Sequence, residues 1–85
     1  MQKNSPRILP SAHKHGASSD DILQAWKRYV KQFVERDDPL KVIRIGFDSQ
    51  ARLLEIGGEI YADGSEKIFH AMPARKRYLE GLWTK

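Results

Sequence analysis

Between residues 18 and 34, hydrophobic positions recur at steps of three and four. This spacing places them on one side of a helix; they are Ile22, Ala25, Trp26, Tyr29, Val30 and Phe33. Ser18 or Ser19 can cap the first turn, and Asp20 and Asp21 follow where acidic side chains suit the helix dipole. The pattern predicts an amphipathic helix that ends at the segment ERDDP, although residues 33–36 also fit a short strand.

From Lys41 onward the pattern alternates with a period of two. Residues 41–47 and 52–61 read as antiparallel strands joined at DSQA, and residues 67–72 read as a third strand. Asp63-Gly64 is a strong hairpin signal because both residue types tolerate positive φ. Pro73 suits the first position of a helix, whose apolar stripe would be formed by Tyr78, Leu79, Leu82 and Trp83.

These elements predict an α+β fold. We expect a small antiparallel β meander of three to four strands, with an N-terminal and a C-terminal helix packed on it. Residues 1–7 read as a flexible tail and residues 8–85 as a single compact domain, in which RILPSAHKHG forms an entry segment long enough for one helical turn.

The composition excludes some classes of function and favours others. The 85-residue chain contains no cysteine, which excludes disulfides and thiolate chemistry, and no apolar run long enough to span a membrane. Its N-terminus lacks the apolar region of a signal peptide, so we expect a cytoplasmic protein. The net charge of +4 comes from basic ends around an acidic middle, which favours a polyanion or an acidic protein as partner.

The segment HKHG is the first candidate site. His13 and His15 flank Lys14, so one short segment supplies two groups that titrate near neutrality and a fixed cation. A polar loop before a helix is the simpler reading of the same residues.

The segment KIFHAMPARKRYL is the second candidate. Regular alternation would place Ile68, His70 and Met72 on one face of the strand, where a histidine usually serves the core. The cations Arg75, Lys76 and Arg77 follow at the expected helix start, and helix N-termini attract phosphate. A solvated helix face would look the same.

Two further groups contain residues that could form a site. Arg52 and Glu55 are three apart on one strand, so they point to opposite faces and cannot form one cluster without a bulge. Three histidines with Glu55 could in principle bind zinc, but nothing in their spacing requires it, so no metal is expected.

Taken together, HKHG, the meander and Met72-Pro73-Ala74-Arg75-Lys76 resemble the BrnT-like ribonuclease toxins of bacterial toxin–antitoxin pairs over about residues 9–80. That family commonly carries KHG early in the chain and a segment of the MRPA-x-R-K kind near its end. This chain lacks most of the family's first strand, and Met72 is followed directly by Pro73 without an arginine between them.

The resemblance implies a RelE-like fold and RNA cleavage that needs no metal or other cofactor. It also implies a cognate antitoxin partner, often of the ribbon-helix-helix type, through which homo-oligomers could assemble. On this reading the acid, base and principal cation come from His70, His15, Arg75 and Glu55, and the remaining RNA contacts from His13, Lys14, Arg52, Lys76 and Arg77. The alternative is a non-catalytic RNA- or protein-binding module that uses the same basic patch.

Overall fold

A single mixed sheet of five strands organises the protein, whose computed structural model describes residues 5–80. Along the chain the elements are β1 (Arg7–Ile8), the 3-10 helix η1 (Pro10–His13), α1 (Ser19–Lys27), β2 (Tyr29–Asp37), β3 (Leu40–Phe47), β4 (Leu53–Ile60), β5 (Glu66–Pro73) and α2 (Lys76–Leu79). The strand order is β1-β5-β4-β3-β2, and only the β1–β5 pair is parallel. The α+β class and the antiparallel meander are confirmed, with more strands than the sequence predicted.

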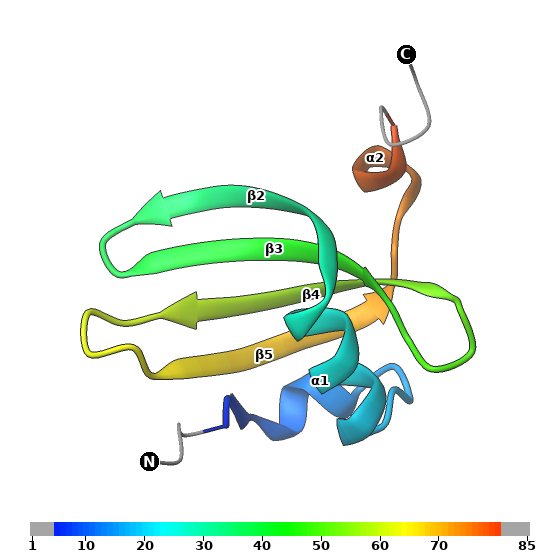
Figure 1. The fold of residues 1–85 in the computed structure, drawn as a ribbon, viewed down its shortest axis with the longest axis horizontal. Coiled ribbons are helices and arrows are strands. Elements are labelled where there is room, and N and C mark those ends of the chain that lie inside the picture. The colour runs from blue at the N-terminus through cyan, green and yellow to red at the C-terminus, as the bar shows by residue number, and fades with distance from the viewer. Residues whose placement is uncertain (1–4, 81–85) are drawn as a thin grey trace.

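One face of the sheet is covered by α1 and η1. The other, called the open face below, carries a smaller buried cluster of Ile43, Ile45 and Tyr78. Helix α1 and η1 lie together on one side of the sheet. Helix α2 follows the end of β5 and lies toward the β2 edge of the sheet (Figure 1). The larger core lies under α1 and includes Ile22, Trp26, Val42, Ile56 and Ile68. Gly46 and Gly58 let the helix approach closely, because a Cβ at either position would lie within 3 Å of α1 atoms.

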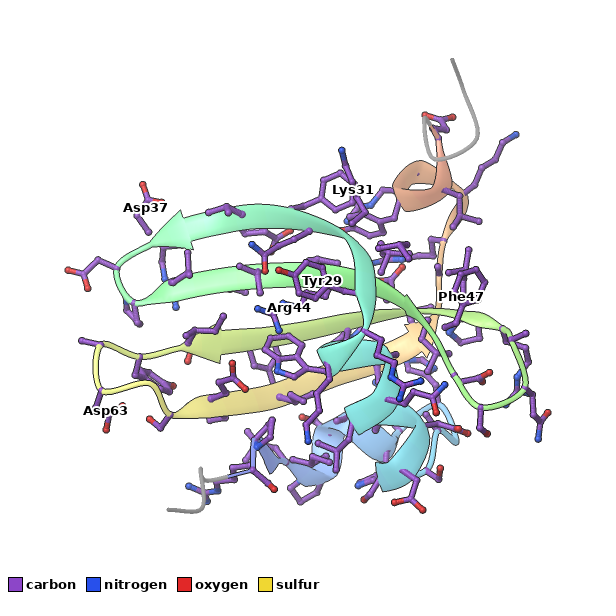
Figure 2. The ribbon with its side chains drawn as sticks, in the orientation of Figure 1. Tyr29, Lys31, Asp37, Arg44, Phe47 and Asp63 are labelled. Carbon is purple, nitrogen blue, oxygen red and sulfur yellow. The ribbon has the colours of Figure 1, made fainter. Side chains whose placement is uncertain are left out.

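The predicted helix is too long. It ends at Lys27, and residues 29–37 form the edge strand β2. Arg44 explains the boundary, since its guanidinium stacks between the rings of Trp26 and Tyr29, at 4.1 and 4.2 Å, and donates to the Trp26 carbonyl oxygen at 3.2 Å. Figure 2 shows Tyr29 and Arg44 together where α1 passes into β2. The short strand considered for residues 33–36 therefore belongs to a longer one, and ERDDP spans the end of β2 and its turn into β3.

The chain ends also differ from expectation. Arg7, assigned to the flexible tail, pairs with Lys67 in the parallel β1–β5 ladder. Pro73 ends β5 instead of starting a helix, and the helical turn α2 begins at Lys76. Leu82 and Trp83, predicted to complete an apolar stripe, lie outside the described residues. Within residues 5–80, no helix has the length and apolar character needed to cross a bilayer.

A β-bulge in β5 decides which side chains reach the open face. Ile68 pairs with Gly58 and His70 with the adjacent Gly57, so β5 has one extra residue, Phe69. The predicted common face of Ile68, His70 and Met72 is therefore wrong. Ile68 is fully buried in the core under α1, whereas His70 shares the opposite face with Glu55.

Candidate functional site

A buried carboxylate lies toward one end of the open face. Glu55, near the start of β4, is fully buried, and both of its oxygens accept hydrogen bonds. Burial alone would raise the pKa of Glu55, but hydrogen bonds from Arg75 and His70 outweigh it and hold the pKa below its usual value. Glu55 is therefore a carboxylate at neutral pH whose lone pairs are already engaged, which suits it to orient its neighbours.

His70 is the first of these neighbours. Its Nε2 lies 2.9 Å from Glu55 Oε2. Because a carboxylate only accepts hydrogen bonds, Nε2 must carry the proton, and in the neutral ring Nδ1 then holds a free lone pair. No residue in 5–80 hydrogen-bonds to that Nδ1. With its side chain 29% exposed, His70 is within reach of solvent and of a ligand.

Arg75 is the second neighbour. Its backbone N–H donates to Glu55 Oε1 at 2.9 Å, and its Nη2 donates to Glu55 Oε2 at 2.7 Å. These contacts hold the segment after β5 against β4 and leave about half of the Arg75 side chain exposed. Helix α2 has only four residues, and the N–H of its N-cap, Arg75, donates to Glu55. A phosphate contact at the start of α2 stays a prediction.

The two histidines of HKHG have different surroundings. His15 is exposed, and its ring lies edge-on to His70 with the centroids 6.3 Å apart. His13 instead closes its own loop, since its Nδ1 donates to the Ala17 carbonyl oxygen at 2.9 Å and its Nε2 lies 3.5 Å from Ser19 Oγ. The two histidines look equivalent in the sequence, where they flank Lys14, but only His15 lies close to His70 in the structure.

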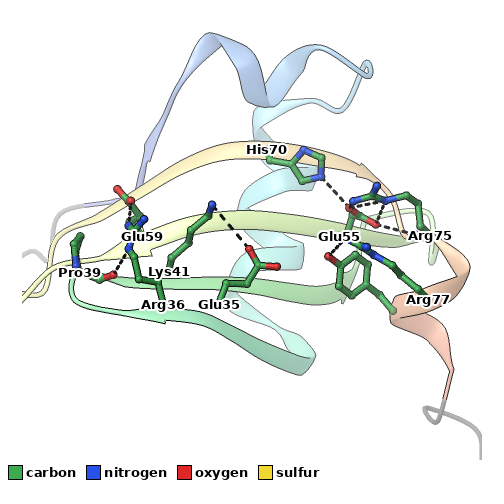
Figure 3. A network of polar contacts seen from close by, with 10 residues as sticks. Glu35, Arg36, Pro39, Lys41, Glu55, Glu59, His70, Arg75 and Arg77 are labelled. Carbon is green, nitrogen blue, oxygen red and sulfur yellow. Dashed lines mark hydrogen bonds and ion pairs between the residues drawn. The ribbon is translucent and has the colours of Figure 1, made fainter.

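A groove runs from this cluster across the open face. It is lined by residues of four elements and the segment before α2: Glu35, Lys41, Ile43, Phe69, His70, Arg75, Arg77 and Tyr78. Two aromatic rings here face cations, Phe69 with Lys41 Nζ at 5.4 Å and Tyr78 with the Arg77 guanidinium at 4.7 Å. Figure 3 shows Glu55, His70, Arg75 and Arg77 gathered at one end of the face, and Arg36 with Glu59 at the other.

The remaining predicted cations are dispersed. Arg52 lies just before β4, where its Nε donates to Asp48 Oδ2 at 2.8 Å, and it lines a separate cavity together with His15. As the spacing argument expected, it does not join Glu55. Lys14 follows η1 and Lys76 begins α2; both are exposed, and neither makes a hydrogen bond or ion pair with the Glu55 cluster within the described chain.

The sequence did not identify five of the groove residues as site residues: Glu35, Lys41, Ile43, Phe69 and Tyr78. It also did not pair Arg75 with Glu55. The adjacent large apolar pair Ile68-Phe69 was an available signal, because a regular strand cannot place both in one core. Among residues 5–80 no cluster of three or more metal-ligating side chains is found.

Comparison with known proteins gives no relative. No family model matches the chain, and no curated protein or solved structure is significantly similar to it.

Proposed function

We propose that this protein is a metal-independent endoribonuclease that cleaves RNA by attack of the ribose 2′-hydroxyl. The observation that carries the proposal is the buried Glu55 carboxylate, which orients His70 and Arg75 toward a cationic groove while the His15 ring lies 6.3 Å from His70. A fully buried, doubly paired carboxylate behind a partly exposed histidine and a half-exposed arginine is costly for a purely structural contact.

His70 is the proposed general base. Its Nδ1 takes the proton of the 2′-hydroxyl, and the 2′-oxygen attacks phosphorus to form a 2′,3′-cyclic phosphate. Glu55 holds the tautomer that this step needs and stabilises the imidazolium that results. The carboxylate thus acts through His70 and does not itself take the proton.

His15 is the proposed general acid. As the bond from phosphorus to the 5′-oxygen breaks, a protonated His15 gives its proton to the leaving oxygen. Each imidazole can hydrogen-bond at about 2.6–3.2 Å, so two rings with centroids 6.3 Å apart reach different oxygens of one phosphate. Arg75 and Arg77 line the same groove and supply positive charge for the phosphorane oxygens.

The groove also suits single-stranded RNA. The partly exposed ring of Phe69 offers a surface on which an unstacked base can lie, and such stacking contributes about 1–3 kcal/mol per base. Tyr78 is buried against Phe33 and forms part of the groove wall. The Phe69 ring would serve equally in a non-catalytic RNA-binding module, which is the second candidate function.

Cleavage of a single-stranded RNA in the presence of EDTA tests the proposal. We expect His70→Ala to slow cleavage by about 10²–10⁴-fold through loss of the base, and Arg75→Ala by about 10²–10³-fold through loss of charge stabilisation. Arg36→Ala is the matched control, because Arg36 pairs with Glu59 on the same face but away from His70. Circular dichroism of each variant establishes that it is folded.

The outcomes separate the two candidates. Wild-type cleavage that both site variants abolish and Arg36→Ala retains supports the enzyme. Salt-sensitive RNA binding with no cleavage contradicts it and favours the binding module.

We further propose that the protein acts as a toxin of the BrnT-like, RelE-related kind, held inactive by an antitoxin that covers the groove. The exposed cations of the groove and the net charge of +4 support an acidic covering segment. Growth arrest on induction, lost in His70→Ala and relieved by the product of an adjacent gene, is the expected result.

A further inference from the structure

A second hollow adjoins the proposed catalytic cluster. This cavity of about 120 Å³ is lined by residues 15–17, Asp48, Arg52, Leu54 and Pro73, where the loop after η1 meets the β3–β4 hairpin and the end of β5. His15 lines the cavity and also faces the His70 ring, so a group bound here would lie next to the proposed scissile phosphate.

The free polar groups of the cavity are mainly hydrogen-bond donors. Asp48 is buried, and its oxygens are engaged: Oδ1 accepts the backbone N–H groups of Gln50 and Arg52, both at 2.9 Å, and Oδ2 accepts Arg52 Nε at 2.8 Å. The two terminal nitrogens of Arg52 make no hydrogen bond with residues 5–80, and its side chain is 63% exposed. The cavity therefore presents hydrogen-bond donors, but its carboxylate is not free to accept.

The walls are apolar and the space is small. Ala17, Leu54 and Pro73 supply surfaces without polar side-chain atoms. A cavity of about 120 Å³ has room for several water molecules or for one flat ring system.

We propose that this cavity binds one unstacked nucleobase next to the cleaved phosphate and prefers guanine or uracil. Guanine presents O6 and N7 as acceptors and uracil presents O4, which the free guanidinium donors of Arg52 can bond. Adenine and cytosine present an amino donor at the corresponding position, which would face those donors without an acceptor. The inference deepens the proposed function and rests on it for the identity of the ligand.

Nuclear magnetic resonance of the full-length, ¹⁵N-labelled chain tests the inference without requiring cleavage. The probes are the four nucleoside 3′-monophosphates, with inorganic phosphate titrated separately. We expect guanosine and uridine monophosphates to shift the amide signals of Gly16 and Ala17 and to bind roughly tenfold more tightly than the adenosine and cytidine forms.

Two variants locate the effect. Ala17→Leu should fill the cavity and abolish the shift at Gly16 while the remaining spectrum keeps its dispersion. Arg52→Lys keeps a positive charge next to Asp48 but loses the planar fork, so the preference for guanine and uracil should fall to about twofold or less.

Equal binding of all four nucleotides, or the same Gly16 and Ala17 shifts with inorganic phosphate, would overturn the inference. Either result leaves the proposed function standing if RNA is still cleaved. Conversely, selective nucleotide binding in a protein that cleaves no RNA would support the cavity and contradict the ribonuclease.

Discussion

At the scale of single residues, Glu55 has the most influence on the candidate site. It is buried on a strand, yet it fixes a histidine from β5 and an arginine from the segment that follows β5. The sequence allowed Glu55 to be nominated as a candidate but not to be given partners, because strand pairing and register decide which side chains lie opposite it.

Glu55→Gln tests this role in isolation. The amide keeps the shape of the side chain but can donate as well as accept, so it no longer imposes the Nε2-protonated tautomer on His70. We expect the cleavage rate constant kcat to fall by about 10²–10⁴-fold, with a much smaller change in KM.

Glu59→Gln is the matched control for Glu55→Gln. Glu59 is also in β4 and also accepts an arginine, Arg36, but it is bonded to Tyr61 and not to His70. The cleavage rate of the Glu59→Gln variant should stay within about twofold of the wild-type rate. Equal rates for the two variants would remove Glu55 from the proposed mechanism.

At the scale of elements, the turns were predictable and the boundaries were not. Asp63-Gly64 forms the expected hairpin turn, in which Gly64 has φ of +90° and the Ser65 N–H donates to Asp63 Oδ1. The α1–β2 boundary was missed because Tyr29, Val30 and Phe33 satisfy the helical spacing and also have high strand propensity. Pairing with β3 decides between the two, and that contact is not local in sequence.

The Phe69 bulge is the other element that sequence could not place. A period of two assigns faces reliably only while no residue is added, and one extra residue reverses every assignment beyond it. The histidine that the regular pattern assigned to the face of Ile68 thereby reaches the open face. The presence of His70 in the groove follows from this one irregularity, so it could not be derived from the pattern alone.

Arg44→Met tests what ends α1. The substitution removes two cation–aromatic contacts and the hydrogen bonds to Trp26 and Gln32, while the apolar stem is retained. We expect the free energy of unfolding to fall by about 2–4 kcal/mol. Urea denaturation followed by circular dichroism measures it.

Arg28→Met is the comparison for Arg44→Met. Arg28 is exposed at the C-cap of α1 and makes no side-chain hydrogen bond within residues 5–80, so its loss should change stability by less than about 0.5 kcal/mol. A similar loss in both variants would mean that the Arg44 stack does not hold the boundary.

At the scale of the whole molecule, the two faces of the sheet differ in composition. The face under α1 carries most of the apolar core, and the open face carries the ion pairs and the groove. The sequence has basic ends around an acidic middle, but folding pairs Glu59 of β4 with Arg36 and Lys67, and Glu55 of β4 with Arg75. Much of the acidic middle is therefore paired internally.

This internal pairing makes stability depend on acid pH. The pKa of Glu59 is lowered to about 2 by hydrogen bonds from Tyr61 and Arg36, and the pKa of Asp48 is lowered by backbone hydrogen bonds that outweigh its burial. Because the folded pKa lies below the unfolded one, the unfolded chain binds more protons in acid. The stabilisation is complete above about pH 4.5 and is lost as the pH falls toward 2.

Urea midpoints measured between pH 7 and pH 2 give the test. We expect a nearly constant midpoint down to about pH 5 and a progressive decline below pH 4.5, since protonation of Glu59, Glu55 and Asp48 breaks their contacts one after another. In Glu59→Gln the starting midpoint should be lower and the decline shallower, because one titrating group has been removed. If the urea midpoint of Glu59→Gln falls as steeply as that of the wild type, the acid sensitivity arises elsewhere in the fold. The contacts of Glu59 would then contribute nothing measurable to stability.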